Sequence, residues 1–507
     1  MIGRILDFSV RARWAVIGVV ALIAALGVYN LVRLPIDAVP DITNKQVQIN
    51  TVVPALAPAE VEKLVTFPVE TAMSGIPGLE STRSISRNGF SQVTIVFKEN
   101  TDLYFARQQV SERLTGVGQT LPEGAQPAMG PISSGLGEVL MWTVAYDHPG
   151  GRGAKIKEGA PGWQSDGAYL TVTGERLTDA TAQAAYLREV QDWIVRPQMR
   201  GVAGVAGVDS IGGYEKQFAV QADPARMAAY GVSFSELGKA LEAANIAVGA
   251  NFMERGGEAY LVRADARVRN IDEIANATVA TRQGVSIRVG DVATVKVGGG
   301  LRTGAASENG EEVVVGTVLM LTGENSRTVA GASAERLKEI AKSLPPGVKV
   351  QITYDRSKLV NATIKTVEKN LVEGALLVIV VLFLLLGNFR AALITALVIP
   401  LSMLMTAIGM NRLGVSGNLM SLGALDFGLI VDGAVIIVEN SLRRLAERQH
   451  HEGRLLTLSE RLRETREAAR EMIAPTVYGQ AIILLVYAPL LTFTGVEGKT
   501  FCRWLSR

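Results

Sequence analysis

The chain has 507 residues, of which 48% are hydrophobic and 20% are charged, and its formal net charge is +2. This composition is too apolar for an ordinary soluble enzyme and too polar for a protein made only of membrane helices, so we expect membrane spans joined to a large water-exposed part. The near-neutral charge argues against a nucleic-acid-binding protein. The single cysteine excludes an intrachain disulfide and a cysteine metal cluster.

Five stretches have the length and apolar character of membrane-spanning helices, about 16 to 22 residues each. They are Trp14–Leu31, Leu371–Leu386, Ala391–Met410, Asn418–Val438 and Met472–Phe493. Arginines precede the first stretch and no clear small-residue cleavage site follows it, so we expect an uncleaved span with its N-terminus in the cytoplasm. The long segment between the first two spans then lies outside the cytoplasm.

Segment 441–471 follows the fourth span and is rich in arginine, which places it on the cytoplasmic side. Leu455, Leu458 and Leu462 recur at helical spacing, which indicates a helix lying along the membrane surface. A solvated basic loop that only fixes the topology is the alternative.

The outer segment, 34–368, has the size of a set of domains rather than a loop, and its pattern is α+β. Alternation and turn residues predict strands at 47–54, 79–87, 90–98, 138–146, 205–213, 311–322 and 348–355. Helical patterns occupy 57–75, 101–117, 178–200, 233–246 and 326–344. Asn88-Gly89 predicts a hairpin turn, and Thr101 or Asp102 is the expected cap of the second helix.

The strand–helix–strand order occurs twice, which indicates a repeated split β-α-β sandwich. The second unit is interrupted by an insert at about 211–297, which has its own strands and a helix. The glycine-rich segment 147–167 is expected to be a mobile loop.

The fourth span, which contains the sequence LDFGLIVDGAVIIVEN at 425–440, carries the carboxylates Asp426, Asp432 and Glu439. Each aspartate in a span costs about 2.5–3.5 kcal/mol. At about 100° per residue, Asp432 and Glu439 share one face about 10 Å apart, and Asp426 points about 120° away. A carboxylate withdrawn from water takes up a proton more readily, so the pattern favours a proton relay. Structural pairing of Asp432 with a cation from another helix is the alternative.

Several motifs carry a resemblance to a known family, among them RLPIDAVPDITNKQVQINT, VEKLVTFPVE, DWIVRPQMR and LDFGLIVDGAVIIVEN. The chain resembles the resistance-nodulation-division (RND) efflux pumps, and more closely their heavy-metal branch of the cobalt–zinc–cadmium type. Multidrug members usually carry adjacent aspartates where this chain reads Asp432-Gly433, and monovalent copper and silver pumps usually lack the first aspartate. This difference, and an aromatic content of only 6%, argue against the alternative of a multidrug exporter. A further alternative is a membrane-anchored scaffold whose carboxylates are structural.

The resemblance implies a proton-driven exporter of divalent zinc, cobalt or cadmium, a secondary transporter rather than an enzyme, with no cofactor. It implies a homotrimer in the inner membrane that works with a periplasmic adaptor and an outer-membrane channel. Asp426, Asp432 and Glu439 match the proton-relay carboxylates of the family. The implied parts are a first helix (1–33), a first porter subdomain (34–131), a second porter subdomain in two pieces (132–210 and 298–368), an inserted docking subdomain (211–297) and spans two to five (369–494).

Family members are about twice as long, so we expect this chain to be the N-terminal half, with an aberrant tail at 495–507 and doubtful transport by itself. For the metal path, Glu138 is similar to an acidic position of the family. His148 is a weaker candidate, with a solvated loop as the alternative. No nucleotide-binding motif is present, so the energy source should be an ion gradient.

Overall fold

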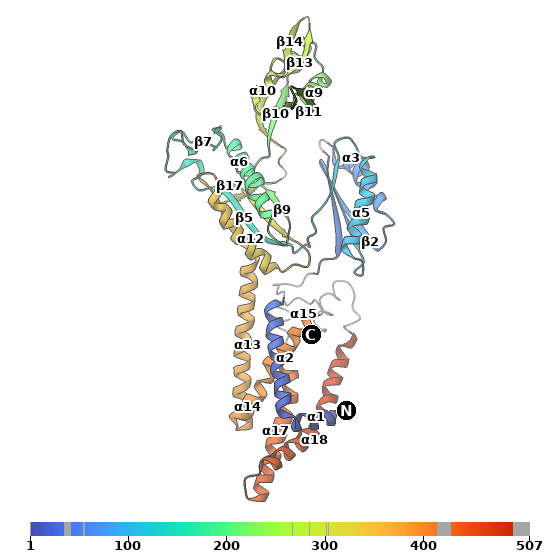
Figure 1. Ribbon diagram of the computed structural model, residues 1–507, viewed down its shortest axis with the longest axis vertical. Helices are drawn as coiled ribbons and strands as arrows, with labels where there is room; N and C mark the ends of the chain where they lie inside the picture. The colour runs from blue at the N-terminus through green and yellow to red at the C-terminus, as the bar shows by residue number, and fades with distance from the viewer. Residues whose placement is uncertain are drawn as a thin grey trace.

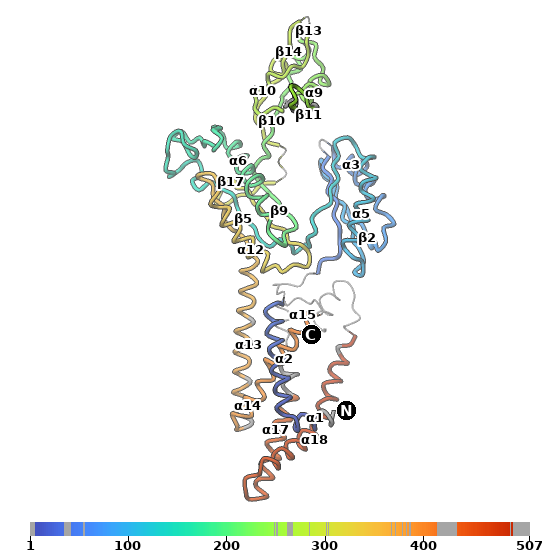
Figure 2. Tube along the Cα trace, viewed as in Figure 1, coloured from blue at the N-terminus to red at the C-terminus, as the bar shows by residue number. Residues whose placement is uncertain are grey.

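The computed structural model describes residues 2–34, 42–53, 56–265, 267–282, 284–300, 302, 304–412 and 427–489. It is elongated, with long helices at one end and three sheet-containing parts at the other (Figure 1). The tube view follows the chain up the first helix, through all three parts, and back down one long helix into the bundle (Figure 2). The predicted combination of apolar helices with a separate part that contains both helices and sheets is therefore confirmed.

The first part is a four-stranded sheet in the order β2-β3-β1-β4 with helices on one face. Its strands are β1 (Lys45–Val52), β2 (Leu79–Arg87), β3 (Phe90–Phe97) and β4 (Gln126–Met129). Its helices are α3 (Pro58–Val61), α4 (Phe67–Met73) and α5 (Leu103–Gly118), with a π-helical turn at Glu62–Thr66. The hairpin turn at Asn88-Gly89 is confirmed, and Gly89 takes the positive φ of 69° that such a turn favours. Asp102 caps α5 by accepting from the Phe105 amide at 2.8 Å.

The second part is a sheet in the order β16-β17-β5-β18, with β9 paired to β17. Its strands are β5 (Glu138–Tyr146), β9 (Val205–Ile211), β16 (Ala306–Glu308), β17 (Glu311–Met320) and β18 (Val348–Asp355). It is covered by α6 (Ala180–Glu189), α7 (Arg196–Arg200) and α12 (Ser326–Ile340), with a π-helical turn at Val190–Val195. The sheet draws its strands from both sides of the insert, as the sequence predicted.

The insert forms the far tip of the molecule (Figure 1). It has three antiparallel pairs, formed by β10 (Lys216–Ala222) with β15 (Ala293–Gly299), β11 (Ala247–Arg255) with β12 (Glu258–Asp265), and β13 (Thr278–Arg282) with β14 (Val285–Arg288). Four short helices accompany them, α8 (Pro224–Tyr230), α9 (Phe234–Ala243), α10 (Ile271–Asn276) and α11 (Val289–Val292). Buried Met227, Leu237 and Val289 belong to a core of its own.

The glycine-rich segment 147–167 differs from the expected loop. It folds into a 3₁₀ turn at Pro149–Gly151 and the strand β6 (Gly162–Trp163), which pairs with β7 (Tyr169–Leu170), itself paired with β8 (Arg176–Leu177). Trp163 is only 4% exposed, and its ring packs 4.9 Å from that of Tyr146. The sequence shows glycines, whereas the aromatic side chains that hold the segment down come from neighbouring strands.

The helical end contains α1 (Ile2–Arg11), α2 (Arg13–Arg33), α13 (Arg356–Leu386), α14 (Phe389–Ala396), α15 (Val398–Arg412), α17 (Phe427–Glu452) and α18 (Leu458–Tyr487). Among the described residues, two helical stretches are long and apolar enough to cross a membrane, namely Arg13–Arg33 and Phe389–Arg412. They coincide with the first and third predicted spans. The second predicted span is the last half of α13, and the fourth and fifth extend partly outside the described residues, so the number of five stays a prediction.

Two of the apolar helices, α2 and α15, cross at very close range. A Cβ built on Gly27 would lie 2.5 Å from the Cβ of Leu404 and 2.9 Å from its carbonyl oxygen. One turn further, the Asn411 side-chain amide donates to Asn30 Oδ1 at 2.7 Å. Small residues and interhelical hydrogen bonds of this kind hold membrane helices together.

Replacing Gly27 with alanine should therefore destabilise the bundle by about 1–3 kcal/mol, because the new methyl group meets the Leu404 backbone. Gly18→Ala is the matched control, since a Cβ there has nothing within 4 Å on the same helix. Thermal unfolding of the two variants in detergent, followed by circular dichroism, measures the difference. Equal unfolding temperatures would show that the crossing of α2 and α15 does not need a glycine.

Candidate proton-relay and metal sites

The three span carboxylates have different positions in the structure. Asp426 lies outside the described residues. Asp432 lies in the first half of α17, and its side chain is outside the described part. Glu439 follows two turns later on the same helix and is exposed. The predicted helical spacing of Asp432 and Glu439 is present, whereas their roles as proton carriers remain a prediction.

At Gly433, the residue after Asp432, α17 approaches α18 closely. A Cβ on Gly433 would lie 3.0 Å from Gln480 Nε2 and 3.0 Å from Thr476 Cγ2. A residue without a side chain at this position allows the neighbouring helix to come close. The backbone next to Asp432 is therefore fixed against polar side chains of another helix.

Asn440, next to the exposed Glu439 and just beyond the end of the predicted span, is a buried polar residue with 5% of its surface exposed. Its amide donates to the Ala468 carbonyl at 3.1 Å and to Glu471 at 3.2 Å. Its oxygen accepts from Arg443 at 2.8 Å. Asn440 thereby sets the register of α17 against α18. The sequence contained no signal for this role, because it depends on which residue of α18 lies opposite.

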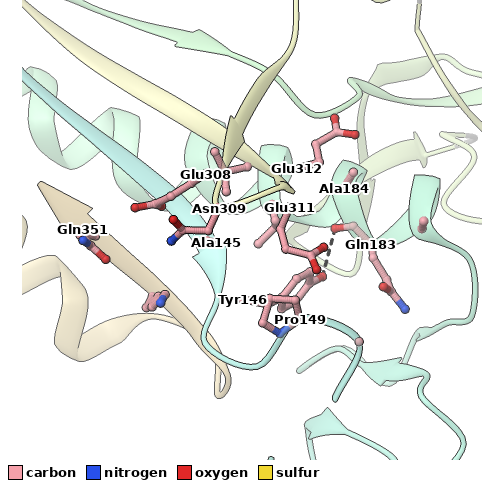
Figure 3. A pocket seen from close by; sticks show the side chains of 15 residues that line it. Ala145, Tyr146, Pro149, Gln183, Ala184, Glu308, Asn309, Glu311, Glu312 and Gln351 are labelled. Atoms are coloured by element: carbon pink, nitrogen blue, oxygen red, sulfur yellow. Dashed lines mark hydrogen bonds between the residues drawn. The ribbon is translucent and has the colours of Figure 1, made fainter. Parts of the chain in front are cut away.

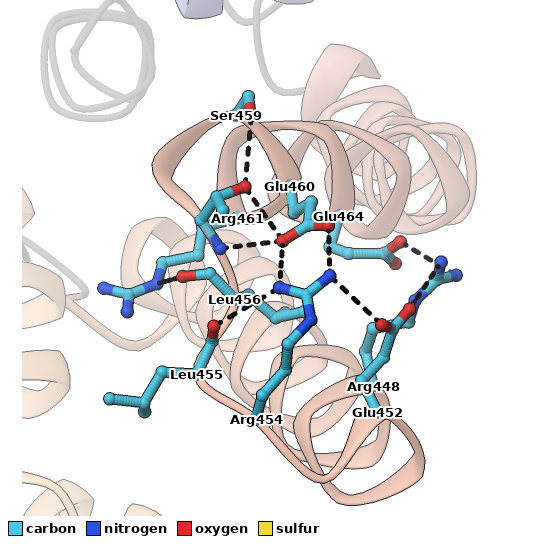
Figure 4. A network of polar contacts seen from close by, with 10 residues as sticks. Arg448, Glu452, Arg454, Leu455, Leu456, Ser459, Glu460, Arg461 and Glu464 are labelled. Atoms are coloured by element: carbon cyan, nitrogen blue, oxygen red, sulfur yellow. Dashed lines mark hydrogen bonds and ion pairs between the residues drawn. The ribbon is translucent and has the colours of Figure 1, made fainter.

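The arginine-rich segment 441–471 forms the tip of a helical hairpin, in which α17 ends at Glu452 and α18 begins at Leu458. Leu458 and Leu462 lie in α18 as predicted, but Leu455 lies in the turn between the two helices, so the three leucines do not share one helix. The segment is helical on both sides of a short turn and is not a loop, and its position along the membrane surface stays a prediction. Part of its positive charge is balanced across the hairpin, since Glu464, with a side chain only 6% exposed, pairs with Arg448 at 3.5 Å (Figure 4). The helical spacing of Glu460, Glu464, Glu467 and Glu471 in α18 is a sequence signal that could have predicted glutamate partners for the arginines of α17.

Arg454 and Glu460 close the turn of the hairpin with an ion pair of 2.7 Å (Figure 4). The hydrogen bond from Arg454, followed by those from the backbone and side chain of Thr457, lowers the pKa of Glu460 to about 2. Glu460 also completes a capping box with Thr457 at the start of α18. The basic segment is thus an ordered structure held by charge pairs.

Glu138, the predicted metal-path residue, is exposed at the first position of β5. Two residues earlier, the Leu136 carbonyl accepts from the buried guanidinium of Arg356 at 3.1 Å. Among the described residues, no group of three or more histidine, cysteine, aspartate or glutamate side chains could hold a metal ion. His148 lies with its Nδ1 3.1 Å from the Arg152 carbonyl. The structure therefore gathers no complete ligand set around Glu138 or His148 in its described part.

An acidic cavity of about 330 Å³ lies at the other end of β5, between α6 and the β16–β17 hairpin (Figure 3). Glu308, Glu311 and Glu312 line it, but two of them already have partners. Glu308 accepts from Thr143 at 2.9 Å, and Glu312 pairs with Arg302 at 2.6 Å. Burial raises the pKa of Tyr146, whose hydroxyl donates to the Gln183 carbonyl on the same wall. These carboxylates do not converge on one point as metal ligands would.

Comparison with known proteins decides the family. Residues 5–504 match the model of the AcrB/AcrD/AcrF family. The chain belongs to this family. It is 66% identical over 501 residues to the nickel-cobalt-cadmium resistance protein NccA of Alcaligenes xylosoxydans xylosoxydans, and 64% identical to the nickel and cobalt resistance protein CnrA of Cupriavidus metallidurans. The cobalt-zinc-cadmium resistance protein CzcA of Cupriavidus metallidurans is 52% identical. The resemblance to heavy-metal RND pumps is thus confirmed.

The fold is also shared with solved structures. A heavy metal efflux pump in its second crystal form matches 99% of this chain with a TM-score of 0.81 and 33% identity. The first crystal form gives a TM-score of 0.80. The chain covers 46% of those chains and 47% of NccA and CnrA, so it spans about half the length of the proteins it matches.

Proposed function

We propose that the chain is part of an inner-membrane exporter that moves divalent heavy-metal cations out of the cell in exchange for protons. The observation that carries this proposal is the identity of 64% or more, over 99% of the chain, to two proteins named for resistance to nickel and cobalt. Because both relatives are named for nickel resistance, we add nickel to the predicted substrates zinc, cobalt and cadmium. A homotrimer with a periplasmic adaptor and an outer-membrane channel is the assembly that the family suggests.

Each part of the fold is assigned one role in the proposed transport. The outer sheets and the inserted tip form the export path and the docking surface, and Glu138 borders the metal path at the start of β5. Asp426, Asp432 and Glu439 take up protons on one side of the membrane and release them on the other. Proton binding and metal transport are coupled through the helices that contact α17, namely α14, α15 and α18. α13 continues directly from β18 and links the outer part to the bundle.

Metal tolerance of a defined host tests this proposal. The host is a Cupriavidus metallidurans strain from which CnrA has been removed. It receives either this chain alone, or this chain joined to the part of CnrA that it does not cover, or intact CnrA. The joined chain is expected to raise the inhibitory concentrations of nickel and cobalt several-fold, and the chain alone to raise neither.

Two results would contradict the proposal. One is a joined chain that accumulates in the membrane but gives no tolerance to nickel, cobalt, zinc or cadmium while intact CnrA does. The other is tolerance to organic antimicrobials without tolerance to metals, which the alternative of a multidrug exporter predicts. Parallel growth series with the four metals also show which cation is preferred.

A further inference from the structure

A groove of about 750 Å³ lies where the end of α1 and the start of α2 meet one face of α18. Figure 1 shows α1 lying beside α18 at the base of the bundle, next to the arginine-rich hairpin. The apolar part of the wall includes Trp14, which is 76% exposed, together with Leu458 and Leu462. Guanidinium groups form the rest of the wall, so the groove is apolar and cationic at once.

The arginines of this groove differ from those of the neighbouring hairpin in their pairing. On the hairpin, Arg443, Arg444 and Arg454 each have a glutamate within ion-pair distance. In the groove, Arg466 pairs with Asp7 at 3.4 Å.

Within the part of the chain that the structure describes, no carboxylate pairs with Arg11, Arg13 or Arg463. All three are exposed. Three positive charges therefore remain for a ligand.

The groove also lies at the level of the membrane surface, on the membrane placement proposed above. Arg13 is the first residue of α2, one of the two stretches able to cross a membrane. An exposed tryptophan beside arginines at the end of a span is typical of the headgroup region, where an apolar ring and a cation both find partners. Basic pockets between helices on the cytoplasmic side suit anionic lipid headgroups.

We propose that this groove binds an anionic phospholipid, with its phosphate against Arg11, Arg13 and Arg463 and its acyl chains against Trp14 and Leu458. Guanidinium groups bind phosphate oxygens in a bidentate manner, whereas the quaternary ammonium of a zwitterionic headgroup would be repelled by the same three charges. A small soluble anion would leave the exposed apolar wall without a partner. The charge and the apolar surface together select a lipid.

Fluorescence quenching of Trp14 tests the proposal independently of transport. The purified chain is placed in phosphatidylcholine nanodiscs that contain a minor fraction of either dibrominated phosphatidylglycerol or dibrominated phosphatidylcholine. The signal of Trp14 is isolated by subtracting that of a Trp14→Phe chain. Brominated phosphatidylglycerol is expected to bind at least about fivefold more tightly, because each arginine near an anionic lipid adds to its attraction.

The triple variant Arg11→Gln, Arg13→Gln and Arg463→Gln should abolish this preference. Arg463→Gln alone should reduce it without touching the N-terminal charges that orient the first span. The matched control is the double variant R443Q and R444Q, which removes two paired arginines of the hairpin that do not line the groove and should keep the preference.

Three results would overturn the proposal. The first is equal quenching by the two brominated lipids in the unmodified chain. The second is competition by inorganic phosphate that removes the preference, which would show that acyl chains are not recognised. The third is no quenching of Trp14 by either lipid, which would show that the groove does not contact lipid acyl chains.

Discussion

A chain with asparagine at position 432 is expected to reach the membrane and to export no metal. Asparagine has nearly the shape of aspartate and can form hydrogen bonds, but it cannot take up and release a proton. If Asp432 carries the protons that drive export, transport by the chain joined to the rest of CnrA should fall about 10²-fold or more, the scale on which positioned proton-transfer groups contribute. Uptake of labelled cobalt into inverted vesicles under an imposed pH gradient measures this directly.

Other carboxylates on the same helix give the matched controls. Glu447→Gln removes a carboxylate from the exposed part of α17, where it pairs with Arg443 at 3.3 Å, and should leave transport unchanged. Asp432→Glu keeps the proton-binding group and should retain part of the activity. Full transport by the Asp432→Asn chain would show that this carboxylate only holds the bundle together, as the scaffold alternative requires.

Glu439 deserves its own variant because it is exposed beside the buried Asn440. If Glu439 belongs to the relay, Glu439→Gln should lower the transport rate, and the rate should respond less to the imposed pH gradient than it does in the unmodified chain. A loss of stability without a change in this dependence would instead assign the end of the helix a structural role, which the bonds of Asn440 to α18 already provide.

The outer fold could be predicted from the sequence wherever the signal is local. Strands β2 and β3 follow from alternation and from the turn at Asn88-Gly89, and the start of α5 follows from Asp102. Such features depend on residues a few positions apart, and their physical causes are contained in short stretches of chain.

Features that depend on distant partners could not be predicted in this way. The ordering of segment 147–167 by Trp163 requires Tyr146 and Tyr169 from other strands. The burial of Glu464 requires Arg448 from the opposite helix of the hairpin. The groove at Trp14 joins residues about 450 positions apart in the sequence, because α1 packs on α18.

The candidate relay has one feature that is local in the sequence and another that depends on distant helices. The sequence places Asp426, Asp432 and Glu439 in one span, since carboxylates stand out in an apolar stretch. On an ideal helix the six-residue separation turns Asp426 about 120° away from Asp432, so a relay that uses both carboxylates would need neighbours on more than one side of the helix. The structure supplies such neighbours for α17, which contacts α14, α15 and α18, and the contact with α18 is close at Gly433.

The largest effect on folding is expected for Trp142→Ala, at about 3–5 kcal/mol of lost stability in the second sheet. Trp142 is fully buried in β5, and its indole nitrogen donates to Gln191 at 3.0 Å. The variant would leave a large cavity and a fully buried glutamine without this partner. Urea unfolding of the purified chain, followed by pulse proteolysis, measures the loss. Trp193→Ala is the matched control, because Trp193 is 79% exposed and its removal should change stability by less than about 0.5 kcal/mol.

Gly316 provides a sharper form of this test, since it lies directly opposite Trp142 in β17. A Cβ on Gly316 would lie 2.3 Å from the indole ring, so Gly316→Ala should be strongly destabilising in the presence of Trp142. In a Trp142→Ala chain the same alanine enters the empty space and should cost little. The two substitutions are therefore expected to be non-additive by about 1–3 kcal/mol. Additive losses would mean that the strands adjust around the ring, and that the glycine is not what allows Trp142 to occupy the core.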